Sequence, residues 1–148
     1  MGSVMTAHTV PWPLQTRLVL AALPTAPGVA RGHVRSITQE WGLADLADTA
    51  ELLASELTTN AVQASQHLSR RADLCLVPVI RLWVTSDRVS MVIHVWDASN
   101  EIPVPHEALP DDDGGRGLML VGGLSKDWGW YRDEEGGKVV WVMLTGGE

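Results

Sequence analysis

Several features are scarce in this 148-residue chain, and each scarcity excludes a class of protein. A single cysteine, Cys75, excludes an internal disulfide framework and fits a reducing compartment. No apolar run approaches the ~20 residues that a membrane-spanning helix needs, and no N-terminal run joins positive charge to an apolar segment. We therefore expect a cytoplasmic protein that does not cross a membrane.

Basic charge is also scarce. The chain has 11 Lys and Arg against 18 Asp and Glu, which gives a formal net charge of −7. Arg70-Arg71 is the only basic doublet, and such a doublet more often ends a helix than binds a ligand. Because binding to nucleic acid phosphates needs a clustered basic face, the composition predicts no nucleic-acid partner.

The length fits one domain that is large enough to bury a hydrophobic core. Residues 1–13 contain Pro11 and Pro13 and are predicted to be a flexible leader. Residues 14–148 are predicted to form a single domain, since no internal repeat or linker interrupts them. Loop-like composition is concentrated between residues 98 and 114, where prolines and a run of three aspartates occur. A connection of this length inside a compact domain is often a functional lid.

Hydrophobic periodicity predicts the order of the elements. Apolar residues recur at helical spacing in two segments and alternate with a period of two in several others. The predicted strands cover residues 16–22, 79–85, 88–96, 127–132 and 138–144, and the predicted helices cover 28–41, 43–69 and 117–124. The order predicts an α+β fold, a two-layer sandwich of a mixed, mostly antiparallel sheet with helices on one face.

The second helix carries an unusual polar line in the stretch "SELTTNAVQAS", residues 55–65. Glu56 and Asn60 lie four residues apart, and Gln63 and His67 continue the same line beside the buried face. Two interpretations are open from spacing alone. The line can be a helix edge whose side chains bond one another, or it can be one wall of a ligand site.

Two other segments offer partners for that line. In "DDDGGRGLMLVGGL", residues 111–124, glycines precede a predicted helix, so unpaired N–H groups and Arg116 are available to phosphate oxygens. No Gly-Lys-Ser/Thr follows, so the segment is not a P-loop. Asp97 ends an apolar strand, where it can meet a ligand or simply begin a turn.

Taken together and in order, these motifs resemble a known family. "SELTTNA", "VWD", "GRGLMLV", "DWGW" and "GKVVWVML" follow one another as they do in the GHKL (Bergerat-fold, histidine-kinase-like) ATPases. Within that superfamily the chain is most similar to the small bacterial anti-sigma-factor serine/threonine kinases. The resemblance covers about residues 16–144.

The resemblance implies roles for individual residues. Asn60 would hold Mg²⁺ against the triphosphate, and Glu56 would be the general base. Asp97 would accept a hydrogen bond from the adenine amino group. Gly115, Arg116 and Gly117 would wrap the phosphates, and residues 98–114 would form the ATP lid.

One departure from the family pattern follows Asp97. The family usually has Asp-x-Gly-x-Gly there, whereas residues 98–101 read Ala-Ser-Asn-Glu. The resemblance therefore implies two alternative functions. The first is an ATP- and Mg²⁺-dependent kinase that phosphorylates a serine or threonine of a partner, with a sigma factor or an anti-anti-sigma protein as partners and a homodimer as one expected state. The second is a non-catalytic partner-switching module with weak or structural nucleotide binding.

Overall fold

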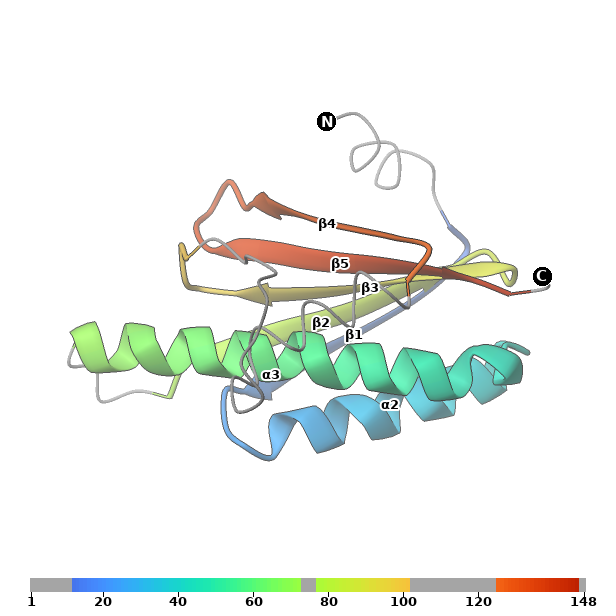
Figure 1. Cartoon of the computed structure of the whole chain (residues 1–148), viewed down its shortest axis with the longest axis horizontal. Coiled ribbons are helices and arrows are strands. Elements are labelled where there is room, and N and C mark those ends of the chain that lie inside the picture. The colour runs from blue at the N-terminus through green and yellow to red at the C-terminus, as the bar shows by residue number, and fades with distance from the viewer. Residues whose placement is uncertain (1–11, 73–76, 102–124, 147–148) are drawn as a thin grey trace, which may run out of the picture.

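The computed structural model describes residues 12–72, 77–101 and 125–146, which form a five-stranded sheet and a layer of helices (Figure 1). The strand order is β1-β2-β3-β5-β4, and every neighbouring pair is antiparallel. The strands are β1 (Leu14–Ala21), β2 (Val79–Ser86), β3 (Ser90–Asp97), β4 (Asp127–Arg132) and β5 (Lys138–Thr145). The predicted α+β sandwich is confirmed, with all pairs antiparallel.

Two helices cover one face of this sheet (Figure 1). They are α2 (Ala26–Glu40) and α3 (Ala47–Ala72), joined by the short 3-10 helix η1 (Ala44–Leu46). Pro27 fits the first turn of α2, where its missing N–H has no helical acceptor to lose. Gly42 adopts a positive φ of 75° directly after α2, a conformation that glycine reaches without steric cost and that ends the helix.

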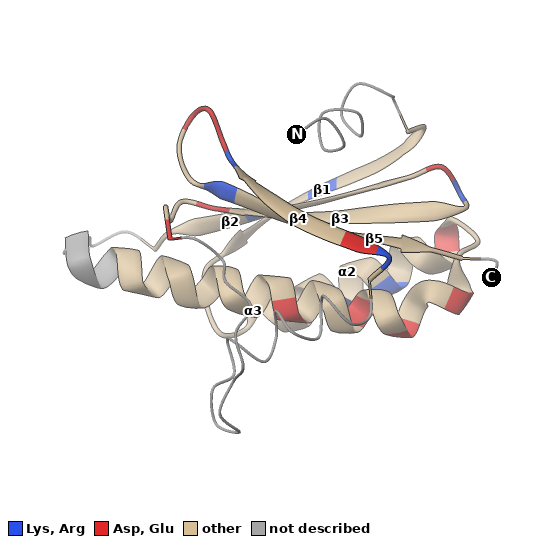
Figure 2. Ribbon diagram, turned by 45° about the horizontal axis from the view of Figure 1, so that its top comes forward, with Lys and Arg blue, Asp and Glu red and all other residues tan. Residues whose placement is uncertain are grey.

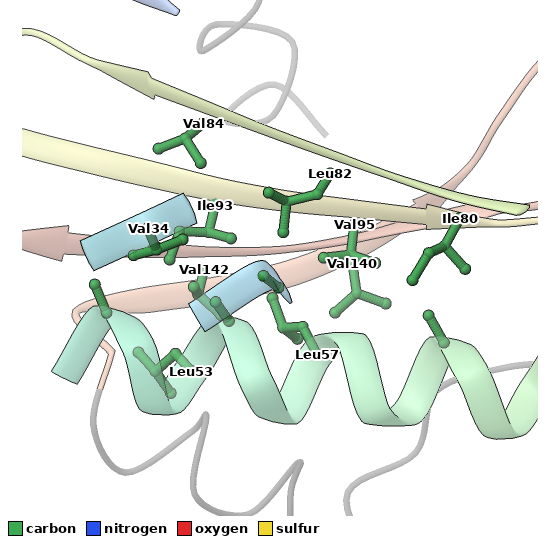
Figure 3. Close-up of a cluster of buried hydrophobic side chains, with 14 of the residues drawn as sticks. Val34, Leu53, Leu57, Ile80, Leu82, Val84, Ile93, Val95, Val140 and Val142 are labelled. Carbon is green, nitrogen blue, oxygen red and sulfur yellow. The ribbon is translucent and has the colours of Figure 1, made fainter. Parts of the chain in front are cut away.

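The core lies between the sheet and the helices, as Figure 3 shows. Alternate residues of β3, namely Met91, Ile93 and Val95, point to the helical layer and are at most 1% exposed. Leu53 and Leu57 of α3 meet them from the other side. Burial of a leucine or isoleucine side chain contributes about 1.5–3 kcal/mol, so this interface fixes where the flanks of α3 lie.

β2 and β3 form one hairpin and β4 and β5 form another. In the β2–β3 turn, Asp87 Oδ1 accepts hydrogen bonds from the N–H groups of Val89 and Ser90, at 2.9 Å and 2.7 Å. In the β4–β5 turn, Gly137 has a φ of 81°, and a Cβ added there would collide with the Asp97 carbonyl and the Trp96 ring. The β4–β5 turn therefore closes directly onto the end of β3.

Among the residues that the structure describes, no helix lies over the opposite face of the sheet (Figure 1). There Trp83 stacks on His94 with ring centroids 4.8 Å apart, and the Arg81 guanidinium lies 4.6 Å from the Trp96 ring. Basic residues are spread over β1, α2 and the ends of β4, as Figure 2 shows. In the described ranges, no helix has the length and apolar character needed to cross a membrane.

Candidate functional site

The line predicted on the second helix lies on one flank of α3. Leu53, Leu57 and Ala61 bury the face that packs on the sheet. Glu56 and Asn60 follow one another by a single helical turn beside that face, and both are half-buried. The packing of α3 thus places a carboxylate and an amide at the edge of the core, where a ligand can reach them.

Asn60 has an unusual amide. Its Nδ2 atom is buried, yet it makes no hydrogen bond within the part of the chain that the structure describes. A buried N–H group without an acceptor costs about 1–3 kcal/mol. An anionic ligand at this flank would supply the acceptor, and the amide oxygen would then face a bound cation. The donor set therefore fits a nucleotide and its metal ion.

Three other buried polar atoms also lack a partner among the described residues: the hydroxyls of Thr58 and Ser65, and Trp141 Nε1. Thr58 and Ser65 are fully buried on α3, and Trp141 is 8% exposed on β5. No ligand can reach the two hydroxyls without opening the core. Asn60 differs because the rest of its side chain borders the surface.

Asp97 occupies the last position of β3 on the face that carries Ile93 and Val95. It is 2% exposed, although a lone carboxylate is rarely buried to this extent. Its Oδ1 atom accepts hydrogen bonds from Lys138 Nζ at 3.0 Å and from the Ser99 N–H at 2.8 Å. Neither bond uses Oδ2, the second carboxylate oxygen.

Lys138 is the partner that sequence reasoning missed. It is the first residue of β5 and pairs directly with Asp97 across the two strands. Its side chain is 5% exposed and forms an ion pair with the Asp97 carboxylate. The available signal was its alternation with Val140 and Val142, which face the core, so a charge at this register had to point inward.

Opposing effects act on the Asp97 carboxyl. Burial is the largest effect and raises the pKa above its ordinary value, because removal from water disfavours the charged form. The charge and hydrogen bond of Lys138 lower the pKa, as does the Ser99 N–H, whereas the nearby Glu101 raises it. The net effect is a raised pKa. Among the groups that lower it, Lys138 has the largest effect, so Lys138 is the main group that favours an ionised Asp97.

The chain after Asp97 replaces the family's glycines with two side-chain turns. The Ser99 N–H donates to Asp97, and the Glu101 N–H donates to Ser99 Oγ at 3.0 Å. Arg132 of β4 also holds this segment, since its Nη1 donates to the Asn100 carbonyl at 3.1 Å. Residues 98–101 are thus ordered by hydrogen bonds, without glycine.

A contact between α3 and this turn brings the two halves of the candidate site together. His67 Nδ1 lies 3.7 Å from Glu101 Oε2. His67 is two helical turns beyond Asn60 on the same predicted line. The end of β3 therefore lies beside the flank of α3 that carries Glu56 and Asn60.

The remaining predicted residues cannot be placed. Gly115, Arg116 and Gly117, the predicted helix 117–124 and most of the lid at 98–114 lie outside the described residues. Within the described ranges, no group of three or more His, Cys, Asp or Glu side chains is arranged to hold a metal ion. A cation at Asn60 would need most of its ligands from a bound phosphate group and water, as is usual for Mg²⁺.

Comparison with known proteins identifies the family. Residues 20–144 match the family of the histidine kinase-like ATPase domain. The fold is similar to the crystal structure of the RsbU and RsbW domains of Rv1364c from Mycobacterium tuberculosis, with a TM-score of 0.55 and 16% identity. That match covers 89% of this chain and 32% of the other, and no curated protein matches significantly. The family match spans most of the sequence, so the chain belongs to the histidine kinase-like ATPases.

Proposed function

We propose that this domain binds ATP with Mg²⁺ and transfers the γ-phosphoryl group to a serine or threonine of a partner protein. The observation that carries the proposal is the buried amide nitrogen of Asn60, which has no acceptor among the described residues. It lies on the flank of α3 that the His67–Glu101 contact joins to the end of β3. Membership of an ATPase family supports the choice of ligand.

Each predicted site residue has a role in this proposal. Asp97 accepts a hydrogen bond from the adenine amino group, and Asn60 faces the phosphates and their Mg²⁺ from one wall of the site. When bound, Mg²⁺ would neutralise part of the phosphate charge. Gly115, Arg116 and Gly117 contact the phosphates, as the resemblance implies, and residues 98–114 close over them as a lid.

Glu56 is assigned the general base. It lies one turn before Asn60 on the same flank, and this position supports its assignment to the side of the γ-phosphate. In the transfer step the partner's hydroxyl oxygen bonds to the γ-phosphorus, and the bond from that phosphorus to the β–γ bridging oxygen breaks. ADP leaves, and Glu56 takes the hydroxyl proton.

The proposed partners come from the resemblance to anti-sigma-factor kinases. The domain would bind a sigma factor, and an anti-anti-sigma protein would be the phosphoryl acceptor. Phosphorylation of that protein would then regulate transcription, and the domain would act in the cytoplasm. A homodimer is part of the same proposal. The alternative, a non-catalytic partner-switching module with weak nucleotide binding, is favoured by the Ala-Ser-Asn-Glu sequence after Asp97, where the family has glycines.

Titration calorimetry with ATP, with and without Mg²⁺, tests the binding proposal. We expect binding that strengthens with Mg²⁺, and we expect Asp97→Ala to weaken it. Absence of heat and of any thermal shift with millimolar nucleotide would remove ATP binding and leave the alternative.

Transfer is tested separately. Partners that co-purify with the domain from its native host are incubated with ATP labelled at the γ-phosphate. Label on a partner serine or threonine supports the kinase. Label that never leaves ATP, with binding intact, supports the partner-switching module.

A further inference from the structure

The Asp97–Lys138 pair is an unusual feature of the sheet. Both side chains point into the helical layer from neighbouring strands and are 3% and 5% exposed. The chain has two lysines, Lys126 and Lys138, and Lys138 is the one placed at this carboxylate. Gly137 lets the β4–β5 turn approach the Asp97 carbonyl closely, since any side chain there would collide with it.

A purely structural role explains this pair poorly. Removing two charges from water costs about as much as their attraction returns, so well-packed apolar residues at such positions are often equally or more stabilising. The neighbouring inward positions of β5 are indeed apolar, at Val140, Val142 and Leu144. An ion pair kept at the last inward position of β3, beside the candidate ligand site, therefore suggests a role in binding.

We propose that Lys138 is a positioning residue for the nucleotide base: it keeps Asp97 ionised and fixes its carboxylate so that Oδ2 accepts a hydrogen bond from the base. This inference rests on the proposed nucleotide function and deepens it. Lys138 Nζ and the Ser99 N–H both donate hydrogen bonds to Oδ1. These two bonds anchor one carboxylate oxygen, and neither of them uses Oδ2.

The charges around Asp97 make its ionisation depend on Lys138. Burial raises the Asp97 pKa, and Glu101 on the following turn raises it further. Lys138 is the cation in direct contact, while Arg132 of β4 bonds the Asn100 carbonyl and His67 of α3 faces Glu101. Without Lys138, the carboxyl would hold its proton to higher pH, and a protonated carboxyl accepts a donor from the base less well.

The test is the pH dependence of ATP affinity in Lys138→Gln, which keeps an N–H donor and removes the charge. Calorimetry is run from about pH 6 to about pH 9 on wild type, Lys138→Gln, Lys138→Arg and the matched control Lys126→Gln. ATP itself titrates in this range, but equally for all variants, so differences between variants report the protein. Circular dichroism confirms folding of each.

We expect Lys138→Gln to bind about tenfold more weakly than wild type near pH 6, because without the Lys138 charge the Asp97 carboxyl holds its proton to higher pH. The deficit should shrink as the pH rises and Asp97 ionises. Lys138→Arg should restore the wild-type profile, and Lys126→Gln should match wild type throughout. A deficit of equal size at every pH, or no deficit, would overturn the positioning role while leaving ATP binding by the wild type intact.

A second measurement does not depend on the variant folding. Carbon-13 NMR of the aspartate carboxyls follows Asp97 in the wild type, with Asp97→Asn used to assign its signal. We expect Asp97 to be ionised at neutral pH and to titrate at lower pH when ADP is bound. A carboxyl that is protonated at neutral pH beside Lys138 would overturn the inference, and a wild type that binds no nucleotide would remove both this inference and the proposed function.

Discussion

The two flanks of α3 have similar polar composition and different surroundings. On the flank that faces α2, Arg35 Nε donates to Glu51 Oε2 at 2.7 Å and Arg31 Nη1 donates to Ser55 Oγ at 2.8 Å. On the other flank, Asn60 presents a buried amide nitrogen with no acceptor among the described residues. On the first flank, side chains of α2 satisfy the polar groups of α3. On the second flank, the Asn60 N–H groups are available to a ligand.

This difference separates structure from function on a single helix. Polar residues at spacings of four occur on both flanks, so the sequence pattern alone does not distinguish them. The position of α2 distinguishes the two flanks, because α2 supplies the guanidinium partners Arg31 and Arg35 to the flank that carries Glu51 and Ser55. We expect substitutions on the α2-facing flank to affect stability alone, and substitutions on the Glu56–Asn60 flank to affect nucleotide chemistry.

The largest expected effect is at Glu56. Glu56→Gln keeps the size of the side chain but removes the basic oxygen, so phosphoryl transfer should slow by ~100-fold or more while ATP affinity stays within about a few-fold of wild type. Glu51→Gln is the matched control, since it makes the same chemical change on the opposite flank of α3. Transfer is measured with labelled ATP and a partner protein. Equal rates for Glu56→Gln and wild type would break the comparison.

Asn60→Ala should affect binding. The loss of a hydrogen bond to a charged ligand costs about 1.5–3 kcal/mol, so the Mg²⁺-dependent affinity for ATP should fall by roughly 10–100-fold. The melting temperature of the ligand-free protein should fall no further than it does for a core substitution of similar size, because the removed amide nitrogen has no hydrogen-bond partner among the described residues. Gln66→Ala, at an exposed position of the same helix, is the control. A matching loss of affinity in Gln66→Ala would mean that the flank is not special.

A smaller effect is expected at His33 of α2, whose Nε2 lies 3.0 Å from Thr16 Oγ1 of β1. Burial lowers the His33 pKa below its ordinary value. The unfolded chain therefore binds the His33 proton more tightly than the folded chain does. The contribution of neutral His33 to the free energy of unfolding is fully present above the unfolded pKa of about 6.5 and declines as the pH falls below it. Urea unfolding at mildly acidic and neutral pH measures this decline. His33→Gln should show less of it, and an unchanged decline would assign it to another group.

The smallest effect is expected for the ion pair between Arg35 and Glu51. Arg35 is 58% exposed, so solvent and salt screen the pair and a double-mutant cycle should give a coupling close to zero at physiological salt. ATP affinity should not change in either single variant. A change in affinity would show that the α2-facing flank also communicates with the ligand.

The sequence predicted the elements well because their signals are local. The helical period of residues 43–69 and the alternation in residues 88–96 report which face of each element is buried, and α3 and β3 end within a few residues of the predicted limits. The boundaries of the elements also have local causes, since Gly42 follows α2 with a positive φ and Asp87 closes the β2–β3 turn with its own carboxylate.

The site was harder to predict because it depends on register. Asp97 was singled out as a strand-end carboxylate, but its partner, Lys138, lies 41 residues along the chain. The β3–β5 register brings the two together. The unpaired amide of Asn60 likewise follows from how α3 rotates against the sheet. The alternation in β5 indicates that Lys138 points inward, but it does not identify Asp97 as the partner, because that contact depends on the packing of several elements.

The strand order has a consequence for how the chain reaches its native state. The β2–β3 and β4–β5 pairs are hairpins between sequence neighbours, but β1 pairs with β2 only after the chain has passed through α2 and α3, so that Leu14 meets Ser86. Closing so long a loop costs conformational entropy before stabilising contacts between β1 and β2 can form. We therefore expect β1 to join the sheet late in folding. A late β1 leaves the free edge of β2 exposed in the meantime, and that edge is where two folding chains would exchange strands or aggregate.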